Sequence, residues 1–186
     1  MAARAFYFDP FCEFLLPGAA RRARGVAVFA SALVTSELGC GRVFVARQHD
    51  HIVGAAAWVA PERYPLPVRR QLRQAAAALW AVKSRPRIIQ PAFAYLTAID
   101  KAHPRDPLWY LSLLVVDPTI QRTGVGGRLQ QPILAEADAH GLDCYLETQR
   151  NENLAYYRRF GYEVVDELHP APSGPPLWTM RRPARR

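Results

Sequence analysis

The sequence has little of what disulfide frameworks, cysteine-based metal centres and membrane spans require. Its three cysteines, Cys12, Cys40 and Cys144, form an odd set without a CxxC pair, which argues against a disulfide framework and a cysteine zinc site. The longest apolar runs, 54–60 and 111–116, are far shorter than the roughly 20 residues of a transmembrane helix. No charged-then-apolar leader opens the chain, so we expect a cytoplasmic protein with no membrane partner and no metal.

Lysine is almost absent too. Only Lys83 and Lys101 occur, so the net charge of +8 comes nearly entirely from arginine, in part from clusters at 21–24 and 181–186. A continuous basic face with interleaved aromatics would favour nucleic acid, whereas scattered arginines form a solvated surface or attract an anionic small ligand. We therefore expect a solvated surface or a polyanionic cofactor, and nucleic acid is the unlikely partner.

What the chain does contain is typical of a folded domain. Half of its 186 residues are hydrophobic and 22% are charged, unlike the composition of disordered chains. We find no internal repeat, low-complexity tract or Gly/Ser linker. The sequence therefore predicts a single domain over residues 1–186.

Hydrophobic periodicity predicts alternating helices and strands. A continuous apolar run at 109–116 indicates a strand buried on both faces. The expected order is a helix at 19–38, a hairpin of strands at 43–46 and 52–59, helices at 68–83 and 88–102, the strand at 109–116, a helix from 125 to the stop at Gly141, a strand at 144–146, a helix at 154–160, and strands at 162–168 and 177–180. Such an order predicts an α/β or α+β layer fold.

A glycine-rich turn follows the buried strand and opens the next helix. It reads Gln121-Arg122-Thr123-Gly124-Val125-Gly126-Gly127. Unpaired amides and the helix dipole at such a point attract phosphate, and glycine lets a ligand approach the backbone. A P-loop would need lysine here, and a dinucleotide fingerprint would need glycine at Leu129. Both fail, which leaves the pattern Gln/Arg-x-x-Gly-x-Gly/Ala.

At this turn the sequence resembles the GCN5-related N-acetyltransferase (GNAT) superfamily, whose pyrophosphate loop for acetyl-coenzyme A has that pattern. A second stretch, Asn153-Leu154-Ala155-Tyr156-Tyr157 with Gly161-Tyr162, resembles the family's second signature. Leu146-Glu147-Thr148, the closing 175–183 segment and the two-helix insert are most similar to the puromycin-acetyltransferase-like branch. The resemblance is strong from Trp109 to Pro183 and looser from Met1 to Ala102.

The resemblance implies the GNAT fold, a mixed, mostly antiparallel central sheet flanked by helices, with a two-helix insert before the central strand. It also implies acetyl-CoA as co-substrate. The cofactor-binding residues would be the backbone of Leu114 and Val116, the loop residues Gln121, Arg122, Thr123, Gly124, Val125, Gly126 and Gly127, and Asn153, which could also cap its helix.

Members of the family open with a further strand ahead of the segment that residues 2–6 resemble. We expect either that the start codon is assigned downstream of the true one or that the protein lacks this edge strand. We expect the gap to leave unpaired donors and exposed apolar surface around 43–46. We also expect the reading frame upstream of Met1 to encode an in-frame segment of about 15–25 residues that supplies this strand.

The reaction needs an acid for the leaving thiolate and a base for the protonated amine. Tyr157 would protonate the leaving thiolate, whereas Tyr156 points elsewhere on its helix and would pack. Glu147 leads as the base, with Asp9 and His103 as alternatives. No GxSxG or cysteine-centred nucleophile motif is present, which favours direct transfer.

The expected activity is acetyl transfer to the primary amine of a small molecule, and a homodimer remains open. We expect the front half and the insert to set the amine, and the alternatives are a non-catalytic acyl-CoA sensor or a basic nucleic-acid-binding module. The aromatic residues expected to contribute to that site are Trp58, Tyr64, Trp80, Phe93 and Tyr95.

Overall fold

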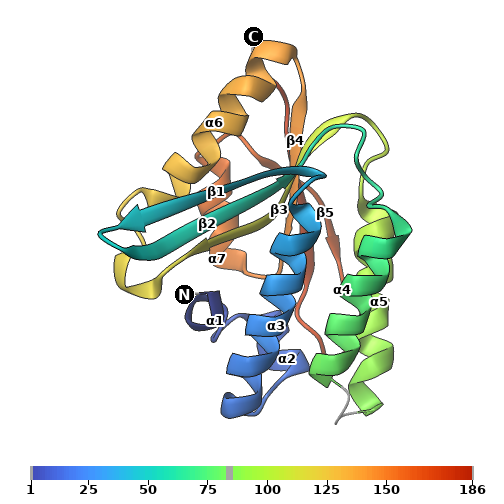
Figure 1. Cartoon of the computed structure of the whole chain (residues 1–186). Coiled ribbons are helices and arrows are strands. Elements are labelled where there is room, and N and C mark those ends of the chain that lie inside the picture. The colour runs from blue at the N-terminus through green and yellow to red at the C-terminus, as the bar shows by residue number, and fades with distance from the viewer. Residues whose placement is uncertain (1, 83–85, 186) are drawn as a thin grey trace.

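Six strands form one mixed sheet in the order β1-β2-β3-β4-β6-β5 (Figure 1). The computed structural model describes residues 2–82 and 86–185. β3 and β4 are parallel, and the other neighbouring pairs are antiparallel, which confirms the predicted mixed, mostly antiparallel sheet. The strands are β1 (Gly41–Gln48), β2 (His51–Val59), β3 (Leu108–Val116), β4 (Asp143–Thr148), β5 (Glu163–Leu168) and β6 (Leu177–Arg182).

Helices flank this sheet, and α4 and α5 form the predicted insert between β2 and β3. In Figure 1, α3, α4 and α5 run side by side. The predicted end of α4 at Lys83 lies outside the described residues. The helices are α1 (Ala2–Ala5), α2 (Pro10–Leu15), α3 (Ala19–Glu37), α4 (Val68–Val82), α5 (Pro86–Ala102), α6 (Val125–His140) and α7 (Asn151–Arg158), with a 3-10 turn η1 (Pro118–Ile120). Within 2–82 and 86–185, no helix combines the length and apolarity that a membrane crossing needs.

The two faces of the sheet carry separate hydrophobic clusters. On one face Trp58, Leu146 and Met180 pack against α6 and α7, and on the other Ala57 and Val115 pack with residues of α1 and α3. β3 supplies buried residues to both faces, with Leu111 in the first cluster and Val115 in the second, which agrees with the predicted burial on both faces. Its buried residues alternate with partly exposed ones, including Leu114 and Val116.

The cause of this partial exposure is a fork in the sheet. β3 and β4 pair only from Leu108 with Asp143 to Leu111 with Leu146, after which β3 follows β2 and β4 follows β6. A β-bulge at Ser112 breaks the register with β2, and the Ser112 hydroxyl donates to the Ala57 carbonyl at 3.1 Å. Bulges bend and twist a strand. The two central strands therefore separate at the bulge.

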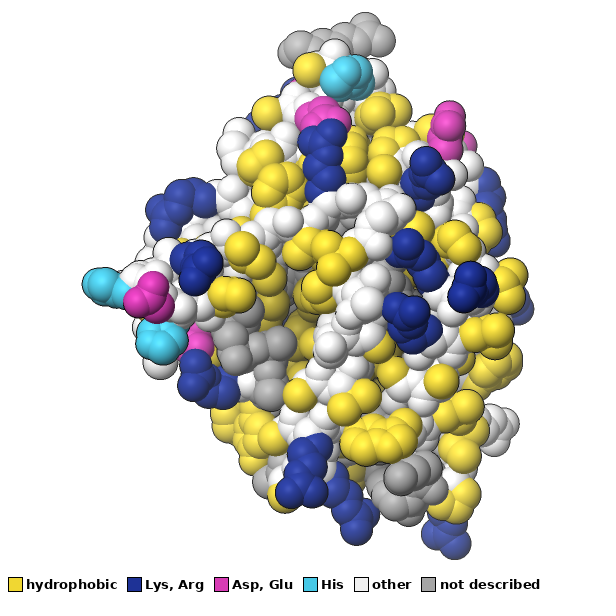
Figure 2. Space-filling model, viewed as in Figure 1, with side chains coloured by type: hydrophobic (Ala, Val, Ile, Leu, Met, Phe, Trp, Pro, Cys, Tyr) yellow, Lys and Arg dark blue, Asp and Glu magenta, His cyan; other side chains and the backbone are white. Residues whose placement is uncertain are grey.

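Several of the clustered arginines hold the chain together. Arg182 is 3% exposed, and its guanidinium makes a bidentate pair with Asp138 at 2.8 and 2.7 Å. Arg22 is also buried and donates to the carbonyls of Leu16 and Pro17, each at 3.0 Å. On the face seen in Figure 2, basic side chains lie in separate groups among hydrophobic and neutral ones. This arrangement lacks the continuous basic stripe that nucleic acid would favour on that face.

β1 forms one edge of the sheet and pairs with β2. Val45 on β1 and Ile52 on β2 are about half exposed, at 51% and 49%. Exposed apolar surface was expected at this edge because an edge strand presents one unpaired side of its backbone.

Candidate functional site

The turn between β3 and α6 is fixed by the carboxylate of Asp117. One of its oxygens accepts from the Thr119 amide at 3.1 Å and the Thr119 hydroxyl at 2.8 Å. Arg4 also donates to this carboxylate, and with Thr119 it lowers the pKa of Asp117 to about 2. Arg4 and Asp117 are 113 positions apart in the sequence, so no local sequence pattern predicts this pair.

The glycine-rich turn uses two left-handed residues to aim its amides. Gly124 has φ +85° and stands as the N-cap of α6, and Arg122 has φ +65°. A positive φ suits glycine and is uncommon for arginine. Among the described residues, the amides of Val125, Gly126 and Gly127 have no hydrogen-bond acceptor. Free amides beside a helix dipole suit an anion, and the anion site at this turn stays a prediction.

Gly126 and Gly127 have a further reason to be glycine. A Cβ on Gly126 would lie 2.6 Å from the Tyr156 hydroxyl, and one on Gly127 would lie 3.0 Å from the Phe160 ring. Gln130, which is fully buried, donates to the Gly126 carbonyl at 3.2 Å and to the Tyr156 hydroxyl at 2.9 Å. The sequence-based reason, room for a ligand, is therefore incomplete, because these glycines let α6 pack closely against α7.

Three predicted ligands use their side chains within the protein. The Gln121 amide donates to the Val116 carbonyl at 3.2 Å, and the Thr123 hydroxyl donates to the Ile120 carbonyl at 2.8 Å. Asn153 donates to the Thr148 hydroxyl at 2.9 Å. The prediction that Asn153 caps its helix is wrong, because α7 begins at Asn151 and its N-cap is Arg150. The helix starts three residues before the Leu154 start that the sequence predicts.

Arg128 is a residue that the sequence analysis missed. Its guanidinium Nη1 lies 3.7 Å from the position of a Cβ on Gly124, one helical turn before it. Together with Thr123 and Val125 it lines a cleft of about 610 Å³ between the β1–β2 hairpin and the start of α6. An arginine four residues after the N-cap glycine is the signal that could have found it.

The peptide groups of Leu114 and Val116 point into the fork. The Asp117 amide donates to the Val53 carbonyl at 2.8 Å, so residues 53 and 117 form a hydrogen-bonded pair. Hydrogen-bonded and non-bonded pairs alternate along an antiparallel ladder. The pairs of Val116 with Gly54 and Leu114 with Ala56 are therefore non-bonded, and their N–H and C=O groups face away from β2. They face the side on which β4 has diverged.

Tyr157 lies on α7 within the cluster that covers one face of the sheet. Its side chain is 7% exposed and packs against the rings of Tyr156 and Tyr162. Burial raises the pKa of Tyr157 above its ordinary value of 10, so the phenol keeps its proton at neutral pH.

Glu147 lies on β4 directly after the last residue that pairs with β3. Burial raises the pKa of Glu147 to about 7, although the hydroxyls of Tyr110 and Tyr145 favour the charged form. A carboxylate with a pKa near neutrality can take up and release a proton under ordinary assay conditions. Its Oε1 is buried and has no hydrogen-bond partner among the described residues.

The two predicted proton-transfer residues lie on opposite faces of the sheet. Successive side chains of a strand point to opposite faces. Leu146 shares the cluster of Tyr157, whereas Tyr145 and Glu147 point to the face where His103 packs. The fork is the place where a molecule passing between β3 and β4 could meet both.

The two alternative bases have different surroundings. Asp9 is the N-cap of α2 and accepts from the amides of Phe11 and Cys12, each at 3.1 Å, which is a structural role. His103 lies beside Tyr145, and their ring centroids are 4.9 Å apart. His103 therefore lies in the same surroundings as Glu147, whereas the Asp9 carboxylate caps a helix elsewhere.

The five aromatic residues expected around the amine do not converge. Trp58 and Tyr95 are fully buried in different clusters, while Trp80 and Phe93 are 47% and 68% exposed on α4 and α5. Only Tyr64 joins the surroundings of Glu147, where it stacks on His103 at 3.5 Å. Helical periodicity does not reveal which of two apolar faces a helix buries, which is why Trp80 and Phe93 were misplaced.

Comparison with known families places residues 75–164 in a match to the acetyltransferase (GNAT) domain. That segment contains the glycine-rich turn, Glu147 and Tyr157. The six-stranded sheet with its flanking helices matches the GNAT fold. The puromycin-acetyltransferase-like branch stays a prediction.

Solved structures of acetyltransferases have the same fold. One from Corynebacterium glutamicum, described as histone acetyltransferase HPA2 and related acetyltransferase, is 24% identical with a TM-score of 0.63, over 99% of this chain and 87% of that one. An agmatine N-acetyltransferase is 19% identical with a TM-score of 0.59, over 94% and 87%. A polyamine N-acetyltransferase from Drosophila melanogaster is 18% identical with a TM-score of 0.54, over 96% and 91%.

Proposed function

We propose that this chain is a single-domain GNAT enzyme that transfers an acetyl group from acetyl-CoA to the primary amine of a small molecule. The observation that carries the proposal is the fork between β3 and β4. It begins beside Glu147, and the glycine-rich turn stands at the end of the β3 arm. An extended thioester threaded through such an opening would present its acetyl group between the two faces of the sheet.

The free groups around the fork suit acetyl-CoA. The amides of Val125, Gly126 and Gly127 would hold the pyrophosphate, and Arg122 and Arg128 would add positive charge. The peptide groups of Leu114 and Val116 would pair with the pantetheine arm as a strand pairs with a sheet edge. When bound, the co-substrate supplies an activated acetyl thioester.

Two residues would move the protons of the reaction. Glu147 accepts a proton from the substrate ammonium, and the neutral amine then attacks the thioester carbonyl, forming the C–N bond. The C–S bond breaks as the tetrahedral species collapses, and Tyr157 donates its phenolic proton to the departing thiolate. The acylated nitrogen releases its second proton to solvent, and solvent returns a proton to the Tyr157 phenolate. A positioned acid or base contributes on the order of 10²–10⁴ in rate.

Most of the rate would come from holding the two reactants together. Proximity and orientation alone can supply roughly 7–11 kcal/mol of the barrier. The enzyme would therefore keep part of its activity when one proton-transfer residue is lost. A total loss in either single variant would argue for a different mechanism.

Direct transfer without an acyl-enzyme fits the state of the cysteines. Burial raises the pKa of Cys144 to about 12 and raises that of Cys12 as well. The thiolate is the nucleophilic form of cysteine. Neither thiol is thus poised to attack a thioester.

A small amine is the substrate class that we infer. Two of the similar structures are described as acetyltransferases of agmatine and of polyamines, which supports this class. A cytoplasmic location and the puromycin-acetyltransferase-like branch belong to the same proposal.

The test is a thiol-release assay with purified protein, acetyl-CoA and a panel of primary amines. Amine-dependent release of coenzyme A, with the acetylated amine identified by mass, would support the proposal. Binding of acetyl-CoA without turnover of any amine would favour the non-catalytic sensor. Salt-dependent nucleic-acid binding that persists in a Gly124→Asp variant would favour a basic binding module.

A further inference from the structure

Three buried polar atoms without partners gather on the face of the sheet that Glu147 faces. They are His103 Nε2, Tyr145 Oη and Glu147 Oε1. None meets hydrogen-bond geometry with a partner among the described residues, although the Tyr145 hydroxyl is near enough to the Glu147 carboxyl to favour its charged form. His103 is 3% exposed and Tyr145 is 1% exposed. Buried polar atoms in folded proteins are nearly always hydrogen-bonded. Three such exceptions in one place call for a ligand.

Ring contacts join these residues into one cluster, which we call the tyrosine–histidine cluster (Tyr64, His103, Tyr110, Tyr145 and Glu147). The His103 ring lies 4.9 Å from both Tyr110 and Tyr145, in edge-on geometry. The ring of Tyr64 stacks on the other side of His103 at 3.5 Å. The hydroxyls of Tyr110 and Tyr145 lie close enough to the Glu147 carboxyl to lower its pKa, which burial raises.

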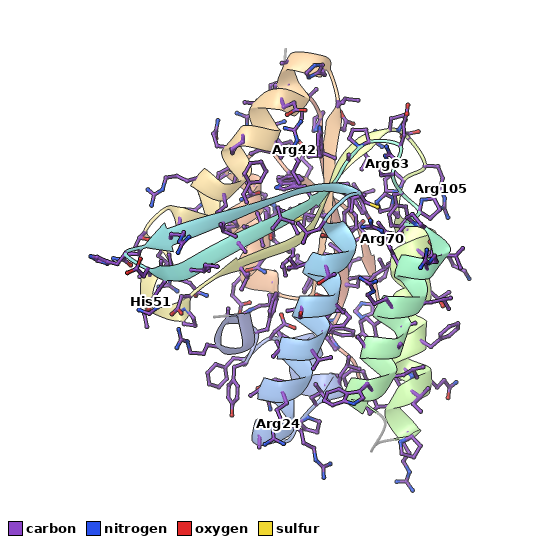
Figure 3. The ribbon with its side chains drawn as sticks, viewed as in Figure 1. Arg24, Arg42, His51, Arg63, Arg70 and Arg105 are labelled. Carbon is purple, nitrogen blue, oxygen red and sulfur yellow. The ribbon has the colours of Figure 1, made fainter. Side chains whose placement is uncertain are left out.

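The segments that carry the cluster meet at one end of the molecule. Tyr64 lies in the loop that leads into α4, and His103 follows the end of α5. These two loops run together in Figure 1, and Arg63 and Arg105, their neighbours in sequence, lie at the same end in Figure 3. Tyr64 is partly exposed, so it separates the buried imidazole from solvent.

Hydrogen-bond polarity tells what kind of ligand the cluster would take. His103 Nδ1 lies 2.7 Å from the Pro104 carbonyl, which can only accept. Nδ1 therefore carries the proton, and Nε2 presents a lone pair. Burial lowers the pKa of His103 to about 4, so the ring is neutral at pH 7. The Tyr145 oxygen and the Glu147 carboxyl also offer lone pairs.

The charges around the cluster favour a cation. The positive charge of Arg105 is close enough to lower the pKa of His103, but the Arg105 guanidinium pairs with the Asp100 carboxylate at 3.8 Å. Tyr64 also donates to Asp100, at 3.3 Å. The cluster thus combines acceptors, aromatic rings and a carboxyl, and the guanidinium beside it already has a partner. An ammonium group has three donors and a positive charge, and it binds favourably to aromatic faces.

We propose that His103, Tyr145 and Glu147 together bind the ammonium group of the substrate, so that the enzyme selects cationic alkylamines over neutral molecules of the same shape. The inference rests on the proposed function, because Glu147 then receives its proton from the group that it binds. His103 and Tyr145 are specificity-determining residues, and Tyr64 and Tyr110 supply the aromatic walls.

The direct test is binding, measured on the full chain by ligand-observed NMR titration with n-butylammonium, butan-1-ol and tetramethylammonium. We expect n-butylammonium to bind at least about tenfold more tightly than the other two probes, since one lacks charge and the other lacks N–H donors. Equal affinity for butan-1-ol would overturn the proposal.

Tyr145→Phe removes one of the unpaired atoms and keeps the ring. We expect about tenfold weaker binding of n-butylammonium with an unchanged or higher Tm, because no hydrogen bond of the fold is lost. The matched control is Tyr162→Phe, which removes another buried, unpaired hydroxyl in the α7-side cluster. It should leave n-butylammonium binding unchanged. A lower Tm with unchanged binding in Tyr145→Phe would assign the hydroxyl a structural role and refute the site.

His103→Phe provides a second variant. It keeps a ring to stack on Tyr64 and loses Nε2, so n-butylammonium should again bind about tenfold more weakly while acetyl-CoA binding is unchanged. Cation-selective binding with no acetylation of any amine would contradict the proposed function but support the ammonium site. Acetylation at the wild-type rate in both variants would support the proposed function but contradict the ammonium site.

Discussion

Replacing Glu147 with glutamine should stabilise the protein and slow its reaction at the same time. Burial holds the pKa of Glu147 at about 7, above its ordinary value of 4.5. A group whose pKa is raised on folding favours the fold in its protonated form. That stabilisation is complete below pH 4.5 and is lost as pH rises through 7. Glutamine has the same shape as glutamate and does not ionise, so the variant does not lose this stability as the pH rises.

The size of the effect follows from the pKa. Moving it from 4.5 to about 7 corresponds to about 3 kcal/mol at pH 8. Part of the Glu147 side chain reaches solvent, which reduces the expected gain to about 2 kcal/mol. At pH 4 the carboxyl is protonated in both states, and the variant should match the wild type.

The assay is urea denaturation of both proteins at pH 4 and pH 8, combined with amine-dependent thiol release. We expect Glu147→Gln to gain about 2 kcal/mol at pH 8 only, and to lose on the order of 10² in kcat/KM. Wild-type kcat/KM should rise with pH and level off above about 7. A Glu147→Gln variant that is less stable at pH 8, or that keeps the wild-type pH profile, would refute both the buried carboxyl and its role as base.

Three further substitutions test the turn and the acid. Gly124→Asp should bind acetyl-CoA at least about tenfold more weakly than Gly124→Asn in a calorimetric titration. Aspartate and asparagine tolerate the φ of +85° alike and differ in charge, so equal affinities would contradict the anion site. Tyr157→Phe should lower kcat on the order of 10² with unchanged acetyl-CoA affinity and Tm, and the neighbouring Tyr156→Phe serves as its control; an unchanged kcat would place the acid elsewhere. Gly126→Ala should cost about 1–3 kcal/mol in a denaturation experiment, and much of the loss should return in the Gly126→Ala/Tyr156→Phe double variant, because the clash is with the Tyr156 hydroxyl. If the double variant recovers nothing, the close packing of α6 against α7 is not the reason for this glycine.

From residue 19 onward the sequence by itself determined the order of the helices and strands, because that information is local, whereas the short helices α1 and α2 were not predicted. Period-2 and period-3.6 patterns placed the hairpin, the insert and the helix after the glycine-rich turn within a few residues of their observed bounds. The turn was readable for the same reason: a strand, a positive-φ glycine and a helix start are neighbours in the chain. Tyr157 lies in a stretch that resembles a family signature, and Glu147 was chosen as a carboxylate at the end of a strand; neither argument contains geometry.

Only the tertiary structure decided what lies beside what. The fork depends on a bulge at Ser112 and on β4 turning from β3 to β6, and neither has a sequence pattern. The same holds for Arg128 over Gly124 and for the packing of Gly126 against Tyr156. The tyrosine–histidine cluster joins residues from position 64 to position 147. Its unpaired atoms exist because burial removes water from groups that are separated along the chain.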